Sequence, residues 1–426
     1  MPRISKTVLF LFFIVPIIGF SQSRREINKN WNLLETGSPE ERIKSAGVLH
    51  DYYSGENIDS IKLIGEKLFN FAIDNNSYSC LEESKIILSV SMMFDQKYIE
   101  SLQILKSVLK KTEKRNDNIQ SSRICRNISQ IFIFLNDGKS ALMWSKKAHF
   151  YLKNQKDKYL ISKVEILTAE SLLILNEEKK AITIFNRLIK YYTNNNKNRR
   201  LEIVYQILGK YYLSSNNLKK SEIYFKKANT ISVKLKLSLP LSHSLNNLAI
   251  IDFEKGNYKE AKEKFLKALD LRIKSNYSKA ISESYYNLGD FYFYQDDLEN
   301  ARKWYLKSEE FSREKNLITE QIDALQALTQ ISKSTKDYEE ACLLFDEILI
   351  AQKKQIDLKS KIDDDWAEIN RQIIISENNE EIFNKSNQYK PILEWILISI
   401  LGVFVVFLSL RKRKTNLNAP EKSSES

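Results

Sequence analysis

Few side chains in this sequence are spaced for catalysis or for metal binding. The histidines and cysteines are isolated from one another: His50, His149, His243, Cys80, Cys125 and Cys342. The sequence contains no CxxC pair, and none of the motifs of phosphate-binding loops, dinucleotide folds, zinc proteases or serine hydrolases. We therefore predict a protein that is not an enzyme and that has no cofactor and no metal site.

The reactive side chains that remain have simpler interpretations. We expect the cysteines to be buried free thiols, with Cys125 at a core position; one Cys80–Cys125 bridge is the alternative. The acidic run of residues 363–365 lies in a polar, helix-forming stretch and is expected to be solvated.

A repeat of 40 residues organises the chain. Its clearest copy is residues 248–268, LAIIDFEKGNYKEAKEKFLKA. Steps of 40 from Ala261 give mostly small residues: Ile61, Ser101, Ala141, Ala181, Ser221, Ala301 and Ala341. Four residues later an aromatic residue recurs at Phe185, Phe225, Phe265, Tyr305 and Phe345, and a first-helix position gives Ala169, Gly209, Ala249 and Gly289. Small residues where two helices cross let the backbones approach, and the aromatic ring fills the adjacent space.

This spacing resembles the tetratricopeptide repeat, a pair of antiparallel helices that is usually 34 residues long. The resemblance implies an all-α fold, a right-handed α-solenoid of about eight 40-residue hairpins over residues 42–361. Each unit would bury its apolar face only against its neighbours. Forty residues imply helices about one turn longer than in the common form.

The resemblance also implies a binding groove, because the first helices of such repeats line a concave face. The family contacts its ligands through positions 2, 5, 6, 9 and 12 of each unit. Counted here, these positions give Arg123, Arg126, Asn127, Gln130, Gln206, Lys210, His243, Asn246, Asn247, Glu283, Tyr286, Asn287 and Asp290. A solvated helix surface is the alternative for all of them. The predicted partner is a protein or a peptide.

The two ends of the chain predict a membrane topology. Residues 1–21 have the pattern of a secretory signal, with an uncleaved anchor as the alternative, and residues 22–41 form a polar lead-in. Residues 362–391 are expected to be a polar helical linker that caps the last repeat, or else a dimerising coiled coil. Residues 392–410 are apolar enough to span the inner membrane, and the basic residues 411–426 would form a cytoplasmic tail. The repeats would then face the periplasm.

Charge is distributed unevenly along the chain. Residues 181–240 carry twelve Lys and Arg against two Glu, whereas residues 281–380 are net negative. Ordinary solvated helix faces explain this, and a field that orients a partner or a second copy of the chain is the alternative. Because the basic block is balanced by an acidic one, we expect no nucleic-acid binding.

Two functions remain open from the sequence. The first is a membrane-anchored, envelope-side scaffold that binds a protein or peptide without catalysis. The second is a sensory component, because the order of parts resembles membrane-bound regulators of Bacteroidetes that carry tetratricopeptide repeats. Many of those regulators continue into a kinase or a DNA-binding domain. No such domain follows Lys414 in this sequence, so the output would lie on another chain.

Overall fold

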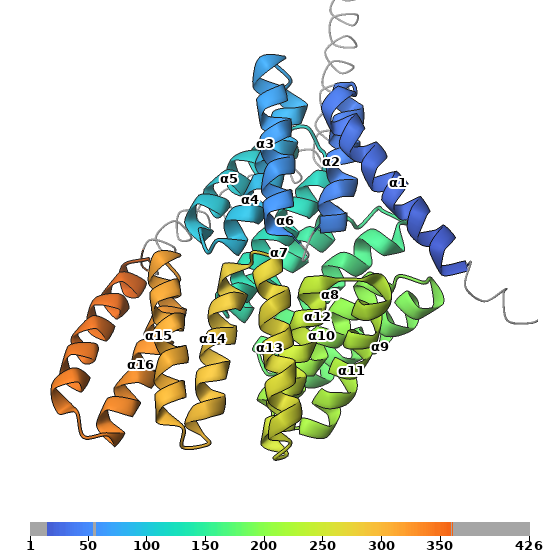
Figure 1. Ribbon diagram of the computed structural model, residues 1–426. Helices are drawn as coiled ribbons and strands as arrows, with labels where there is room; N and C mark the ends of the chain where they lie inside the picture. Colours follow the sequence, from blue (N-terminus) through green and yellow to red (C-terminus); the bar gives the residue numbers. More distant parts are fainter. Residues whose placement is uncertain (1–14, 54–56, 359, 361–426) are drawn as a thin grey trace, which may run out of the picture. The chain divides into compact units, whose positions relative to one another are not determined.

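The computed structural model describes residues 15–53, 57–358 and 360, and within them every regular element is a helix. After α1 (Val15–Thr36), the helices alternate as the first and second members of eight hairpins (Figure 1). The first helices are α2 (Pro39–Tyr53), α4 (Tyr78–Phe94), α6 (Asn118–Phe134), α8 (Lys158–Ile174), α10 (Asn198–Ser214), α12 (Ser238–Glu254), α14 (Ser278–Phe293) and α16 (Ile318–Ser334). The second helices are α3 (Ile58–Asp74), α5 (Tyr98–Lys114), α7 (Gly138–Tyr151), α9 (Glu178–Asn194), α11 (Leu218–Leu235), α13 (Tyr258–Lys274), α15 (Leu298–Glu314) and a helix over residues 338–358.

The predicted 40-residue unit is divided into two equal halves, each a helix followed by a short turn. A residue in the left-handed conformation ends most helices, and these residues recur every 20 positions. They are Asn76, Gln96, Asn116, Asn136, Asn176, Asn196, Asn216, Lys236, Gly256, Asn276, Asp296, Asn316 and Lys336. Asparagine tolerates this conformation better than most residues, which explains why it dominates the set. The next amide bonds back into the helix, as Ser77 N does to Ala72 O at 2.9 Å.

Close helix crossings confirm the role of the small residues. A methyl group added to Gly209 would lie 2.7 Å from the ring of Phe225, and one added to Gly289 would lie 2.4 Å from Tyr305. Both rings are buried on the second helix of the same hairpin. The glycines therefore let each first helix approach an aromatic side chain.

First helices of successive repeats also pack on one another, from α2 through α4, α6, α8 and α10 to α12. Among α1 to α16, successive second helices show no backbone packing of this kind, although side chains such as Lys147 on α7 and Glu113 on α5 bridge some of them. The first helices thus form an inner layer, and this layer positions the candidate site.

One helix was not expected from the sequence. Residues 22–41 were predicted to be a polar lead-in, but α1 occupies most of this stretch and buries Leu34 against α2 and α3. Ser38 and Glu41 form a capping box at the start of α2, with Ser38 N donating to Glu41 Oε2 at 2.9 Å. Pro240 lies in the first turn of α12, and the preceding turn is centred on Lys236.

Residues far apart in sequence meet where the repeats coil back on themselves. Gln96 Nε2 donates to Glu320 Oε2 at 3.1 Å, and Asn276 Nδ2 donates to Asp59 Oδ2 at 2.8 Å. The rings of Phe94 and Tyr277 meet edge to face, with their centroids 5.8 Å apart. The first two repeats are therefore joined to the turn that precedes α14 and to α16.

No helix in the described part of the chain is long and apolar enough to cross a membrane. The predicted linker (362–391), membrane span (392–410) and tail (411–426) lie outside the described residues, as do residues 1–14 of the predicted signal. Residues 15–21 form the start of α1.

Candidate functional site

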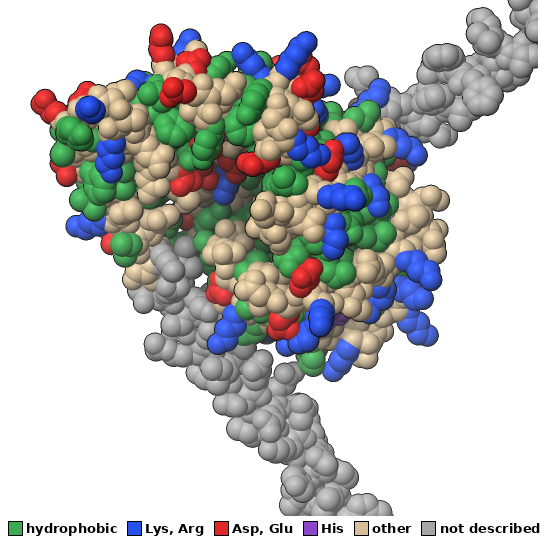
Figure 2. Space-filling view, turned by 90° about the horizontal axis from the view of Figure 1, so that it is seen from below, with side chains coloured by type: hydrophobic (Ala, Val, Ile, Leu, Met, Phe, Trp, Pro, Cys, Tyr) green, Lys and Arg blue, Asp and Glu red, His purple; other side chains and the backbone are tan. Residues whose placement is uncertain are grey.

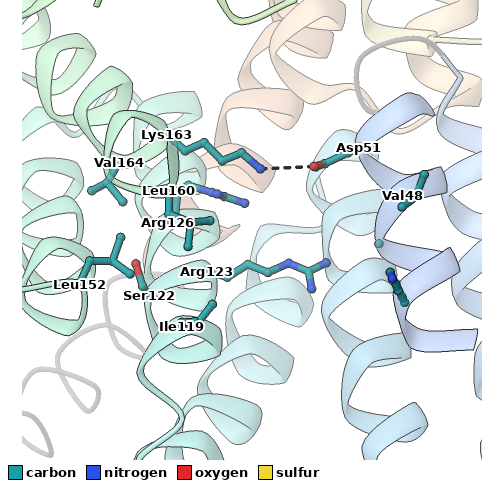
Figure 3. A pocket seen from close by; sticks show the side chains of 12 residues that line it. Val48, Asp51, Ile119, Ser122, Arg123, Arg126, Leu152, Leu160, Lys163 and Val164 are labelled. Atoms are coloured by element: carbon teal, nitrogen blue, oxygen red, sulfur yellow. Dashed lines mark hydrogen bonds and ion pairs between the residues drawn. The ribbon is translucent and has the colours of Figure 1, made fainter. Parts of the chain in front are cut away.

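Two adjacent cavities lie against the inner layer of first helices, with volumes of about 290 Å³ and about 280 Å³. They share three charged residues, Asp51 on α2, Arg126 on α6 and Lys163 on α8. We call the two cavities together the basic hollow. Figure 3 shows Arg123 and Arg126 extending from α6 into the first cavity, with Lys163 and Asp51 meeting beside them.

The four groove residues predicted on α6 all line the basic hollow. Arg123 borders the first cavity, Arg126 borders both, and Asn127 and Gln130 border the second. Their spacing along α6 places them on one helix face, the face turned toward the hollow. The structure thus brings this predicted set together.

Two carboxylates partly neutralise the hollow. Arg123 Nη1 contacts Glu83 Oε1 at 2.6 Å, and Lys163 Nζ contacts Asp51 Oδ2 at 3.3 Å. Burial alone would raise the pKa of Asp51, but the hydrogen bond from His50 and the charge of Lys163 hold that pKa well below its usual range. Asp51 is therefore ionised at neutral pH.

The cations of the hollow are not fully compensated. Burial, followed by the charges of Arg200 and Arg123, lowers the pKa of Arg126 to about 10. Burial lowers the pKa of Lys163 to about 8, despite the opposing charge of Asp51. The surroundings disfavour the charged form of both side chains, but both remain charged at pH 7 because their pKa values lie above 7.

Two carboxyl groups on α8 and α10 have the opposite character, and one of them, Glu202, borders the second cavity of the hollow. Burial raises the pKa of Glu202 on α10 to about 7 and that of Glu170 on α8 to about 7. The predicted groove residue Gln206 donates to Glu202 Oε1 at 2.8 Å and to Pro240 O at 2.9 Å, which ties α10 to α12. Lys210, also predicted, is exposed on α10.

Two of the predicted residues of α12 take part in the packing between helices. Asn246 is 5% exposed and accepts from Asn287 Nδ2 at 2.9 Å. His243 is half-buried; its Nδ1 lies 3.3 Å from Nη2 of the buried Arg272, and burial with the charge of Arg272 lowers the pKa of His243. These contacts join α12 to α13 and α14. Asn247, also half-buried, donates to the carbonyl of His243 in its own helix.

A third cavity, of about 140 Å³, is acidic. Three predicted residues of α14 line it, Glu283, Tyr286 and Asn287, together with Glu320 and Asp323 of the next repeat. Burial and the charge of Glu320 raise the pKa of Asp323. The fourth residue predicted on α14 instead joins the packing: Asp290 Oδ1 accepts from Tyr305 Oη at 2.6 Å.

Three residues at or beside these cavities were not predicted, although the sequence carries a signal for them. The family's contact positions in the second, fourth and eighth units include Glu83, which pairs with Arg123, and Lys163 and Asp323, which line cavities. Asp51 has no such signal, because it lies at position 10 of its unit and is brought in by the coiling of the repeats.

No group of His, Cys, Asp and Glu within the described residues is arranged to hold a metal ion. All three cysteines are free thiols; Cys80 and Cys125 are buried, whereas Cys342 is exposed, contrary to expectation.

Charge also differs between the faces of the repeats. Figure 2 shows a hollowed face with Lys and Arg side chains gathered on one side and Asp and Glu side chains near the depression. Residues 181–240, which include α9 and α11, carry twelve Lys and Arg against two Glu.

Comparison with known proteins agrees with the hairpin geometry. Family models described as tetratricopeptide repeat match residues 241–314 and residues 203–232. The chain contains tetratricopeptide repeats. No curated protein sequence matches it.

Solved structures with the same solenoid fold are distant in sequence. A Rap protein complexed with competence and sporulation factor is 14% identical; the alignment has a TM-score of 0.56 and covers 79% of this chain and 99% of that chain. Aspartyl phosphate phosphatase F from Bacillus subtilis is 14% identical, with a TM-score of 0.51 and coverage of 83% and 96%. A signal transduction ATPase from Pyrococcus horikoshii with a tetratricopeptide repeat sensor is 13% identical, with a TM-score of 0.50 and coverage of 80% and 52%. At these identities the similarity shows the fold alone.

Proposed function

We propose that this protein is a non-catalytic scaffold that binds a segment of a protein or peptide in the basic hollow. The observation that carries the proposal is the pair of adjacent cavities on the inner layer, which expose charged and polar side chains from four first helices. Binding sites are concave, and they combine apolar walls with a few convergent polar groups. The Rap protein that shares this fold was solved in complex with competence and sporulation factor, which supports the binding of a separate partner by the repeats.

Site-specific photocrosslinking of the full-length protein in cells tests this proposal. A photoreactive residue at Asn127, which lines the hollow, should yield covalent adducts with a partner protein or peptide. The matched control is Leu266 on α13, a second helix, where the side chain is 42% exposed. Adducts from Leu266 alone, or from neither position, would reject the hollow as the binding surface.

We further propose that residues 392–410 anchor the protein in the inner membrane, with the repeats on the periplasmic side. The apolar composition of this stretch and the basic cluster after it support the proposal. Protease added to intact spheroplasts should then digest the repeats. Protection of the repeats until the membrane is lysed would contradict this topology.

A sensory role is the second candidate. It is favoured by the Pyrococcus horikoshii ATPase, whose repeats are described as its sensor. In this case a ligand in the hollow would change the activity of a separate kinase or regulator. Replacement of residues 392–410 by an unrelated membrane span should abolish the response, and an unchanged response would reject signalling through the span.

A further inference from the structure

We infer that the basic hollow receives a carboxylate group of the bound segment, at Arg126, beside an apolar side chain of the same ligand. This inference rests on the proposed function and specifies the chemistry of the ligand at that site. The carboxylate can come from an Asp or Glu side chain or from the C-terminus of a peptide.

Arg126 is the half-buried cation of the hollow that lacks a partner among the described residues. Among the described residues, no hydrogen bond and no ion pair within 4.0 Å joins its guanidinium group to another side chain. Its neighbours are already engaged: Arg123 with Glu83 at 2.6 Å, and Lys163 with Asp51 at 3.3 Å. Arg200 lies 4.0 Å from the same Asp51 carboxylate.

The hollow therefore has a surplus of positive charge. Asp51 and Glu202 are the acidic residues that line it, and Glu83 pairs with Arg123 from outside. The cations that line it are six: Lys44, Arg123, Arg126, Lys163, Arg199 and Arg200. A partly buried charge without a partner is destabilising, because water solvates it less than it would at the surface. An incoming carboxylate would offset that cost, and the guanidinium fork matches a carboxylate in two parallel hydrogen bonds.

The wall beside Arg126 is apolar. The first cavity is lined by Val48, Ile119, Leu152, Leu160 and Val164. Leu152 lies there because α7 ends at Tyr151, before the regular 20-residue turn, so that this buried side chain reaches the cavity. An apolar side chain of the ligand can bury its surface against this wall while the neighbouring carboxylate meets Arg126.

Binding of synthetic peptides to the purified full-length protein tests the inference. Each fluorescent peptide pool fixes Asp, Asn, Leu or Lys at one position and randomises the rest, with both ends blocked. Fluorescence anisotropy then gives an affinity for each pool. At the preferred position, Asp should bind about tenfold more tightly than Asn. A parallel set with a free C-terminus distinguishes the sources, because a terminal carboxylate would bind tightly without a fixed Asp.

The variant Arg126→Gln should lose this preference to less than about twofold. Arg187→Gln is the matched control, because Arg187 is 63% exposed on α9, outside the hollow, and should keep the preference. If peptides bind but Asp equals Asn and free ends equal blocked ends, the inference is wrong and the proposed function stands. If no pool binds at all, peptide binding itself fails, and the inference fails with it.

The stability of the free protein gives a second readout. Because Arg126 is an unpaired charge, Arg126→Gln should leave the thermal midpoint unchanged or raise it. A lower midpoint would show that Arg126 supports the fold, which would overturn its assignment as a ligand group.

Discussion

Replacement of Gly289 by alanine should destabilise the seventh repeat. The added methyl group would lie 2.4 Å from Tyr305 Cδ1 and 2.5 Å from Cε1, well inside contact distance. Tyr305 is 2% exposed, and its hydroxyl donates to Asp290 at 2.6 Å, so the ring cannot move aside freely. Overpacking of this kind costs up to about 3 kcal/mol, and alanine regains about 1 kcal/mol of helix propensity. We expect a net loss of about 2 kcal/mol in the free energy of unfolding.

Urea denaturation followed by circular dichroism measures this loss, and the chain offers a matched control. Gly47 lies in α2 with nothing within 4 Å of an added methyl group, so Gly47→Ala should stabilise the protein by up to about 1 kcal/mol. Adding Tyr305→Leu to Gly289→Ala should cost less than the sum of the two single changes, because the obstructing ring is gone. A Gly289→Ala variant that is as stable as Gly47→Ala would refute the close approach of the two helices.

Three further predictions concern buried and exposed groups. Glu202 has its pKa raised from 4.5 to about 7, so the folded protein holds a proton that the unfolded chain releases, and stability should fall as pH rises between these values. At pH 8 the ionisation of Glu202 costs about 3 kcal/mol in the free energy of unfolding, and Glu202→Gln should remove this cost. Urea denaturation at several pH values measures it, and a pH profile that the substitution leaves unchanged would contradict the prediction. Arg123→Gln should cost about 3 kcal/mol at pH 7, because the carboxylate of Glu83, 3% exposed, loses its ion pair; thermal unfolding checks it, and an unshifted midpoint counts against the pair. A thiol reagent should modify Cys342 rapidly in the native protein and the two buried cysteines only on unfolding; rapid reaction of all three would disprove their burial.

The repeat architecture was predictable because its physical requirement recurs in every unit. Gly209 and Gly289 stand where a first helix meets an aromatic ring, and this constraint is visible as a small residue in step with Phe225 and Tyr305. A second regularity, at 20 residues, was not predicted. Left-handed residues, eight of them asparagines, end helices both within and between the 40-residue units, but they do not repeat strictly enough in residue type to stand out in the sequence.

The candidate site was predictable only in part, because it depends on how the units coil. The face of α6 follows from helical spacing, so Arg126 could be placed on it from the sequence. The meeting of Asp51 with Lys163 joins the first unit to the fourth, and no local pattern encodes that approach. Asn246 occupies a contact position of the family, yet it is buried beside Arg272, whose Nη1 donates to it. The position of a residue within its unit does not reveal such burial.

The contacts of Gln96 with Glu320 and of Phe94 with Tyr277 change how the protein should tolerate shortening. In an open array, each repeat contacts only its immediate neighbours, so terminal repeats can be removed one at a time. Here a deletion at residue 320 would also strip the second repeat of a partner more than 200 positions away. The repeats should therefore unfold in one cooperative transition, and not one after another from the ends.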